Sequence, residues 1–490
     1  MHTLQLLSSI SCATALAVCD IAAQCGPIRT AQSAIGGNVA SLAALTDGRV
    51  AVGGWFVNNP PGASRVAIFD PTTQSWDLLA GGCNGPVQAV AQMPNGDLIA
   101  AGRFSVAGGV AVDNIARWNG STWTPLAGGG PPSGVPATIY SLLVLPNGDL
   151  LAGGDFAEIE GTPVQGLARW DGTTWTSVGY PYLLAPVALT LTPNGDLIVV
   201  DLYAIERLSG GTWSIEAAIL GGYVNTATTL VDGTIVFAGN FSHLGTTPAM
   251  NVAQLRGGTW SALGGGVGGI ASGLTQLPDG DLVVVGDFDH AFDGGGAKVV
   301  DGIARWDGQQ WTSFAGSAPG NVQAIVRNHD DSLTFAGFLL AGSGAQNRLA
   351  TIRSACPAQA SSFGLGCAGS AGTVTLAAES RPWLGGTYAA RASGLPAAAL
   401  GVSVLGFAPS MLPLATVLPA SANCFLFSTA DQLELSVPGA GVLTTHLPIP
   451  DSLALTGATF RQQVLTIELG SAGIVDVSAS NGLLLTIGSL

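Results

Sequence analysis

Two histidines and three aspartates occupy positions where the side chains of a repeat protein could bind a ligand. His243 and His290 each follow a repeated phenylalanine by two positions, in adjacent repeats, and Asp289 precedes His290. Asp155 and Asp287 stand directly before that phenylalanine in two repeats. Imidazole nitrogens and carboxylate oxygens bind polar ligands and metal ions. We predict these five residues as ligand contacts. Two histidines one repeat apart lack a third metal ligand, so we predict no metal site and no cofactor.

No catalytic constellation accompanies these residues. Beyond residue 24 the histidines are His243, His290, His329 and His446, and the sequence holds no Gly-x-Ser-x-Gly, Cys-x-x-Cys or His-Glu-x-x-His motif. The glycine run at 264–266 precedes neither a helix nor a Lys-Ser/Thr pair, so it does not predict a phosphate-binding loop. We therefore predict no catalytic residue, and a non-catalytic protein is favoured over an enzyme.

The charge balance argues against nucleic acid as a partner. The chain has a formal net charge of −15 at pH 7, and Lys298 is its single lysine. Its arginines are scattered along the sequence, so they predict no basic patch. Only 10% of the 490 residues are charged, whereas 70 are glycine and 27 are proline. This composition indicates short strands joined by many turns.

The first 24 residues are typical of a signal peptide. A mostly apolar stretch runs from Leu4 to Val18, and small residues such as Ala22 and Ala23 offer cleavage positions. A second apolar tract, 394–420, contains four prolines that would break a membrane-spanning helix, so we predict no membrane span. We expect a secreted protein that is extracellular, periplasmic or at the cell surface.

Removal of residues 1–24 would leave an odd number of cysteines in an oxidising compartment. Cys367 with Cys424 is the favoured pair, because both lie in the C-terminal part of the chain. Cys25 with Cys356 would tie together the two ends of the preceding domain. Spacing alone decides neither pairing, and at least one cysteine is left over or pairs between chains. The sequence leaves the oligomeric state open.

Internal repetition is the strongest signal in the sequence. Pro146-Asn147-Gly148-Asp149-Leu150 is followed by Gly-x-Phe, by Ala-Arg-Trp-Asp-Gly and by a further tryptophan, and 93–129 and 278–311 repeat this order. Successive copies of the turn lie about 40 to 50 residues apart, which is the length of one propeller blade. Each copy contains four strand-like runs, as expected for a four-stranded antiparallel blade.

We predict a seven-bladed β-propeller over residues 25–355. The seventh repeat stops at Cys356 without its tryptophan strand, whereas 30–35 resembles the last strand of a blade. The N-terminal strand would then complete the seventh blade and leave no open edge. The tryptophans recur in every full repeat, so we interpret them as core packing and not as sugar-stacking residues. Arg117, Arg169, Arg207 and Arg305 share one position, and we expect a cross-strand ion pair or a surface ladder, with Asp155 and Asp287 on the preceding strand in two of these repeats.

The repeat motifs resemble those of the kelch and delta-sixty families of propeller repeats. The resemblance rests on segments such as Pro278-Asp279-Gly280, Gly286-x-Phe288 and Ala304-Arg305-Trp306, and covers about residues 36–353. It implies a propeller but no single activity, because these families include adhesive, ligand-binding and enzymatic members. The fourth repeat departs from the pattern, since Asp201-Leu202-Tyr203 replaces Gly-x-Phe and the long loop that should follow is missing.

Residues 356–490 lack the tryptophan repeat and return to alternating apolar runs, such as 433–437 and 463–469. A small β-sandwich module is the simplest interpretation. Segments 364–370, 382–386 and 480–483 resemble a C-terminal module found on otherwise unrelated exported bacterial proteins. Such a module could serve in sorting, carbohydrate binding or adhesion.

Two functions follow from these features. The favoured one is an exported, non-catalytic binding or structural protein whose propeller loops contact a glycan, peptide or matrix partner. The alternative is a propeller hydrolase, lyase or oxidase that acts on polysaccharide, with loop carboxylates such as Asp155, Asp287 and Asp289.

Overall fold

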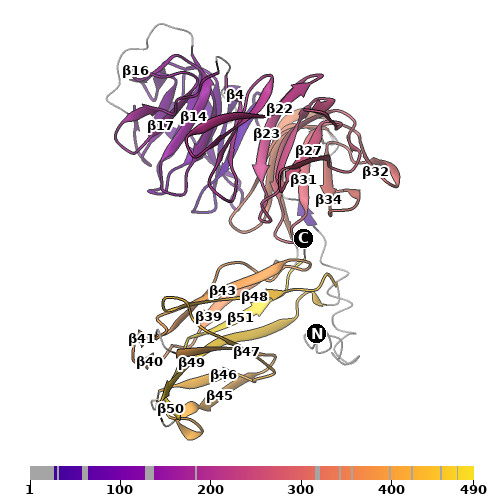
Figure 1. Cartoon of the computed structure of the whole chain (residues 1–490). Helices are drawn as coiled ribbons and strands as arrows, with labels where there is room; N and C mark the ends of the chain where they lie inside the picture. Colours follow the sequence, from indigo (N-terminus) through magenta and orange to yellow (C-terminus); the bar gives the residue numbers. More distant parts are fainter. Residues whose placement is uncertain are drawn as a thin grey trace. The chain divides into compact units, whose positions relative to one another are not determined.

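The computed structural model describes residues 27–29, 33–57, 64–126, 137–182, 185–314, 320–341, 344–354, 357–396, 399–420, 423–452, 455–471 and 473–489. Among these residues there are strands and two short 3₁₀ turns, η2 (Leu79–Gly81) and η3 (Leu414–Thr416), and no α-helix. Among these residues, no helix is long and apolar enough to span a membrane. The chain divides into two compact units, one spanning Arg29–Ile352 and the other holding Arg353–Leu490 (Figure 1). The predicted signal peptide, 1–24, lies outside the described residues.

The first unit consists of antiparallel sheets that follow one another along the chain. Sheets one to three contain β3 (Val39–Ala44), β4 (Val50–Val57), β5 (Ser64–Asp70) and β6 (Ser75–Asp77); β7 (Val87–Gln92), β8 (Leu98–Gly102), β11 (Ile115–Trp118) and β12 (Trp123–Thr124); and β13 (Thr138–Val144), β14 (Leu150–Asp155), β17 (Leu167–Trp170) and β18 (Trp175–Ser177). Sheets four and five contain β19 (Ala188–Leu191), β20 (Leu197–Val200), β21 (Ala204–Ser209) and β22 (Thr212–Leu220); and β23 (Tyr223–Thr229), β24 (Ile235–Asn240), β27 (Val252–Arg256) and β28 (Thr259–Ala262).

Sheets six and seven complete the unit. Sheet six contains β30 (Ile270–Gln276), β31 (Leu282–Asp287), β34 (Ile303–Trp306) and β35 (Trp311–Ser313). Sheet seven contains β36 (Gly320–Arg327), β37 (Leu333–Ala341) and β38 (Gly344–Ser354), with β1 (Pro27–Arg29) and β2 (Ser33–Ala34) from the N-terminal side on its outer edge. The first strand of each sheet lies against the first strand of the next, and β3 also lies against β36. The predicted class, an all-β propeller followed by a β-sandwich, is confirmed.

The N-terminal segment takes part in the last sheet. Ser33 pairs with Leu349 and Ala34 with Arg348, so β2 adds to β38. Ile35 follows at once and is buried with Val52 and Leu349 in one apolar cluster. The first and last parts of the unit are thus joined by backbone pairing and by apolar contact.

A small hairpin follows the second strand in several sheets. These hairpins are β9 (Val106–Ala107) with β10 (Val110–Ala111), β15 (Glu158–Ile159) with β16 (Thr162–Pro163), β25 (His243–Leu244) with β26 (Thr247–Pro248), and β32 (His290–Asp293) with β33 (Gly296–Val299). β25 pairs with β22 of the preceding sheet, and β32 pairs with β29 (Gly266–Val267) in the connection from the preceding sheet. The hairpins therefore lie on the side of the connections between sheets. In sheet four, β20 and β21 are joined directly through residues 201–203.

The second unit is a sandwich. One sheet orders β39 (Gln359–Phe363), β51 (Gly482–Thr486), β49 (Thr459–Gly470), β44 (Ala399–Gly406) and β47 (Gln432–Ser436), with β50 (Gly473–Ala479) also on β49. The facing sheet orders β42 (Thr375–Ala378), β43 (Thr387–Ser393) and β48 (Val442–Pro448), and apolar side chains from both sheets form one core. Short pairs of strands join β40 (Ala368–Gly369) to β41 (Gly372–Thr373) and β45 (Pro409–Pro413) to β46 (Phe425–Ser428).

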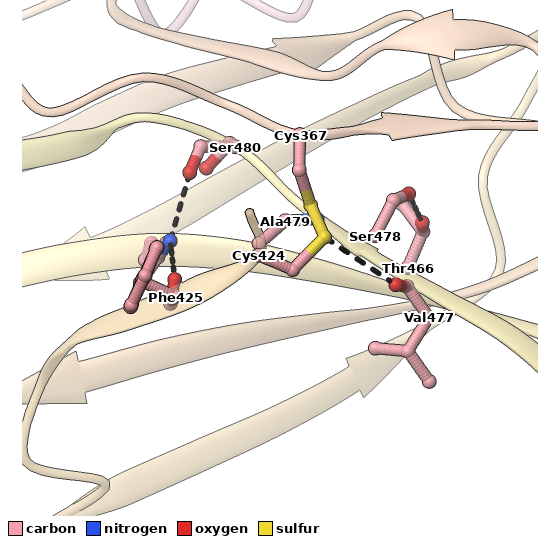
Figure 2. The surroundings of a disulfide bond; sticks show 9 residues. Cys367, Cys424, Phe425, Thr466, Val477, Ser478, Ala479 and Ser480 are labelled. Carbon is pink, nitrogen blue, oxygen red and sulfur yellow. Dashed lines mark hydrogen bonds between the residues drawn. A yellow bond between two sulfur atoms is a disulfide. The ribbon is translucent and has the colours of Figure 1, made fainter. Parts of the chain in front are cut away.

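A disulfide joins Cys367 to Cys424 in this unit, as the sequence predicted, with a Cα–Cα distance of 5.3 Å (Figure 2). The backbone N–H of Ala479 donates to Cys367 Sγ at 3.0 Å, and both cysteines are buried in an apolar cluster with Val404 and Val477. Cys83 is a free, buried thiol, and burial raises its pKa to about 12. The second predicted pair, Cys25 with Cys356, lies outside the described residues.

Candidate functional site

A cleft of about 320 Å³ lies beside Asp155, one of the predicted ligand contacts. Asp155 ends β14 with an exposed side chain, and the buried Phe156 follows it. Gln165 and Tyr182 line the same cleft, Gln165 from the end of the hairpin loop and Tyr182 from the segment between β18 and β19. The cleft thus lies where sheet three leads into sheet four.

Backbone hydrogen bonds hold this cleft in shape. After Phe156 the chain forms the hairpin β15–β16 and returns at Val164, whose N–H donates to the carbonyl of Ala157 at 2.9 Å. The N–H of Gly166 donates to the carbonyl of Phe156 at 2.9 Å. Because the two limbs of the loop are tied at their base, Asp155 and Gln165 are both held at the rim of the cleft.

The side chains around this cleft offer three kinds of interaction. The Asp155 carboxylate accepts hydrogen bonds, the Gln165 amide both donates and accepts them, and Tyr182 provides an aromatic ring with a hydroxyl group. Aromatic rings bury the apolar faces of ligands, while carboxylates and amides bind hydroxyl groups. The cleft can therefore form hydrogen bonds and an aromatic contact with a small ligand.

His243 lies in a strand whose backbone pairs with strands on both sides. It lies in β25, opposite Leu220 of sheet four and Pro248 of its own hairpin. Its Nδ1 lies 3.0 Å from the hydroxyl of Ser242, and its side chain is half-buried. One edge of the imidazole therefore has a local partner, and the ring stands at the junction of sheets four and five.

Asp287, Asp289 and His290 lie between the end of β31 and the start of the β32 hairpin. Asp287 ends β31 with an exposed side chain. Asp289 Oδ1 lies 2.8 Å from His290 Nδ1, and this hydrogen bond from His290 lowers the pKa of Asp289. The structure therefore brings Asp289 and His290 into contact, whereas Asp155 belongs to sheet three. Within the described part of the chain, no group of three or more His, Cys, Asp or Glu side chains is placed to hold a metal ion.

The repeated arginines form ion pairs, but with other partners than expected. Arg305 Nε lies 2.6 Å from Asp281, and Arg117 Nε lies 3.5 Å from Asp97. Arg169 pairs with Asp149 in the same way. The predicted partners Asp155 and Asp287 are not used, because each arginine lies opposite the second residue of the preceding strand, next to the turn aspartate.

The tryptophans pack as the repeat predicted. Trp118 and Trp123 lie 5.5 Å apart between ring centroids, and Trp306 and Trp311 lie 5.0 Å apart. Trp123 and Trp311 are buried, and the indole N–H of Trp123 donates to the Leu79 carbonyl at 2.6 Å. These rings therefore pack within the propeller unit, as expected of core residues.

Sheet four contains a buried acidic cluster that was not predicted from the sequence. Asp201 and Glu206 are 0% and 1% exposed, and the hydroxyl of Tyr180 donates to Asp201 Oδ2 at 3.2 Å. Burial, with the charge of Asp201 added, raises the pKa of Glu206 to about 8. The available signal was the departure of the fourth repeat from its pattern, because Glu206 stands where the aligned repeats have alanine.

A second cleft, of about 400 Å³, opens between the same two sheets. Its walls are mainly apolar, with Leu151 from β14 and Leu197 and Leu208 from sheet four, and Arg169 at its edge. Leu208 stands where Trp170 and Trp306 stand in their sheets, opposite the first residue of the second strand. The smaller side chain helps to leave this space open.

Comparison with solved structures finds β-propellers at low sequence identity. The WD40 β-propeller domain of Doa1 aligns over 67% of this chain and 97% of that chain, with 13% identity and a TM-score of 0.45. A virginiamycin B lyase from Staphylococcus aureus, solved with quinupristin, aligns over 67% and 99%, with 11% identity and a TM-score of 0.44. YCF48 bound to a D1 peptide aligns over 67% and 96%, with 13% identity and a TM-score of 0.42. No protein-family model and no curated protein matches the sequence. These likenesses assign no activity to the chain.

Proposed function

We propose that the protein is an exported, non-catalytic binding protein whose propeller unit holds a glycan in the cleft beside Asp155. The observation that carries this proposal is the cleft's lining, which combines the Asp155 carboxylate, the Gln165 amide and the Tyr182 ring in about 320 Å³. Cavities of roughly 300 Å³ or more are large enough for small ligands. The other predicted contacts, His243, Asp287, Asp289 and His290, stay predictions of further contacts on the loops of sheets five and six.

Glycan chemistry is supported by the pattern of polar groups. A pyranose ring presents hydroxyl groups around its edge and C–H groups on its faces. Asp155 and Gln165 can bind vicinal hydroxyl groups, because one accepts hydrogen bonds and the other both donates and accepts. Tyr182 is partly exposed at the cleft, and its ring can cover a sugar face. A peptide would need backbone donors and acceptors along an extended groove.

Export is supported by cysteine chemistry. The disulfide between Cys367 and Cys424 is typical of proteins in oxidising compartments. The apolar leader 1–24 would supply the signal. We propose that the second unit folds after export as a disulfide-bonded module.

The proposal is tested with the full-length mature protein on a glycan array, followed by calorimetric titration of the best oligosaccharide. Asp155→Asn and Tyr182→Ala should each weaken binding about tenfold or more, since each removes a group that contacts the sugar. Glu158→Gln is the charge-matched control, because Glu158 lies exposed in the same hairpin and does not line the cleft. Its affinity should equal that of the wild type.

Three results would overturn this proposal. The first is the absence of any bound glycan on an array that retains its positive controls. The second is binding that Asp155→Asn and Glu158→Gln reduce equally. The third is turnover of a polysaccharide by the wild type, which would favour an enzyme instead.

A further inference from the structure

Glu206 occupies a position that is alanine in the other six sheets. In sheet three Ala168 lies opposite Ala152, and in sheet four Glu206 lies opposite Val199 at the same step of the ladder. The corresponding alanines are all buried, and they are Ala67, Ala116, Ala168, Ala253, Ala304 and Ala350. Sheet four therefore places a carboxyl group where the fold otherwise places a methyl group.

The surroundings of Glu206 leave its charged form poorly compensated. Asp201 accepts three hydrogen bonds, from the backbone N–H groups of Tyr203 and Ala204 at 2.7 and 2.8 Å and from the hydroxyl of Tyr180 at 3.2 Å. Oε2 of Glu206 has no hydrogen-bond partner among the residues the structure describes. Donors stabilise an ionised carboxylate, and burial without a partner for Oε2 favours the protonated form of Glu206.

The cations of this region are engaged elsewhere. Arg207 Nε lies 3.0 Å from Glu216 and its Nη1 lies 3.8 Å from Asp196. Arg169, on the facing sheet, pairs with Asp149. The titratable groups that act on Glu206 are Asp201 from its own hairpin and Tyr180 from the segment before β19.

We propose that Glu206 and Asp201 hold a single proton between them, and that its release to water displaces Tyr180 and with it the Tyr182 wall of the cleft. The rings of Tyr180 and Tyr182 lie edge to face with centroids 5.4 Å apart, and Tyr180 also meets Trp213 at 5.1 Å. The effect on ligand binding in the cleft rests on the proposed function, whereas the proton held by Glu206 and Asp201 does not.

The physical reason is charge repulsion in a dry environment. Deprotonated Glu206 would face the Asp201 carboxylate among apolar side chains such as Leu167, Leu189 and Val199, which surround Tyr180. Two carboxylates repel far more strongly there than in water. The Tyr180 hydroxyl donates to Asp201 and its hydrogen bonding also lowers the pKa of Glu206, so the ring would shift as the two carboxylates move apart. Burial keeps the pKa of Tyr180 above its ordinary value near 10, so its hydroxyl stays protonated while Glu206 loses its proton.

The experiment is NMR of the full protein with ¹³C at tyrosine Cζ, which gives one resonance for each of the six tyrosines. Tyr180→Phe and Tyr182→Phe assign the two resonances of interest. Between pH 6 and pH 9.5, both should move in the wild type with one midpoint near the pKa of Glu206, about 8. In Glu206→Gln, which cannot release a proton, neither resonance should move in this range.

Two further variants complete the test. Glu206→Ala restores the residue of the other six sheets, so it should fold and also abolish the movement. Glu158→Gln removes an exposed carboxyl and should leave the midpoint unchanged. The shared proton is overturned if the Tyr180 resonance stays fixed in the wild type, or if it moves equally in Glu206→Gln. Movement of Tyr180 without Tyr182 would overturn the link to the cleft. No ligand is used, so an array without a glycan signal leaves these outcomes unaffected.

Discussion

Arg305 donates to both acids of the turn before β31. Its Nε lies 2.6 Å from Asp281 Oδ2, and its Nη2 lies 2.6 Å from Asp279 Oδ2. The Arg305 side chain is 28% exposed, the Asp279 side chain is 10% exposed and the Asp281 side chain is 17% exposed. Arg305 lies opposite Val283, and Asp281 shares the face of Val283 because alternate residues of a strand point the same way. The pair thus ties the third strand to the turn.

Replacement of Arg305 by leucine should lower the free energy of unfolding of the first unit by about 3 kcal/mol, because it leaves two largely buried carboxylates without their cation. Arg49→Leu is the control: Arg49 pairs with Asp47, but both side chains are over a third exposed, so the loss should stay below about 1 kcal/mol. Denaturant unfolding followed by tryptophan fluorescence measures both, since all tryptophans but Trp383 lie in this unit. Equal losses would show that burial of the ion pair is unimportant.

Stability should depend on pH through Glu206. Its pKa is raised in the folded protein, so the protonated form favours folding; the contribution is complete below the unfolded pKa, near 4.5, and is lost as pH rises toward 8. The free energy of unfolding of the wild type minus that of Glu206→Gln should therefore fall by about 1.4 kcal/mol per pH unit across this window. Urea unfolding at pH 5, 6 and 7 measures this difference. The contributions of the other titrating groups are the same in both proteins and cancel. A constant difference would contradict a buried, protonated Glu206.

Loss of the disulfide should destabilise the second unit alone. Cys367 and Cys424 are 57 residues apart, and closure of a loop of that length is worth about 4 kcal/mol in the chain-entropy model. The double variant Cys367→Ser with Cys424→Ser should lower the melting transition of this unit in calorimetry and leave that of the first unit unchanged. A shift in the first unit's transition would indicate that the two units unfold together.

Removal of residues 1–36 should destabilise the first unit, because it deletes the β2 strand and the buried Ile35. Loss of the buried Ile35 side chain and of two backbone pairs should lower the free energy of unfolding by about 3 kcal/mol. Removal of residues 1–24 is the control and should change nothing, since the described pairing begins beyond it. Thermal melting of the two truncated proteins tests whether the N-terminal strand seals the last sheet. Equal melting temperatures would contradict that role.

The sequence predicted the fold because its signals are local and repeated. Each turn and each tryptophan recurs with one period, and Trp311 and its equivalents pack as that period required. The arginine position was predicted correctly, but its partner was not. Asp287 lies four residues beyond Val283 along β31, about 13 Å away, and only the strand register reveals that distance.

The candidate site was predicted only in part. Asp155 was identified from its position before the phenylalanine, but Gln165 and Tyr182 belong to a loop and a connection that carry no repeated pattern. Glu206 aligns with buried alanines, yet an acid in a strand is ordinarily exposed. Its burial depends on the direct connection between β20 and β21 and on Tyr180, which comes from outside the repeat. The departure of the fourth repeat from its pattern marks Glu206 as unusual, whereas its contact with Tyr180 leaves no trace in the local sequence.

Hydrogen exchange with mass spectrometry, with and without the oligosaccharide selected on the array, locates the residues that the ligand protects. We predict slower exchange on binding in peptides that cover 154–166 and 180–182, and the loss of this protection in Asp155→Asn. Protection confined to other sheets, or to the second unit, would contradict the placement of the ligand in the cleft beside Asp155.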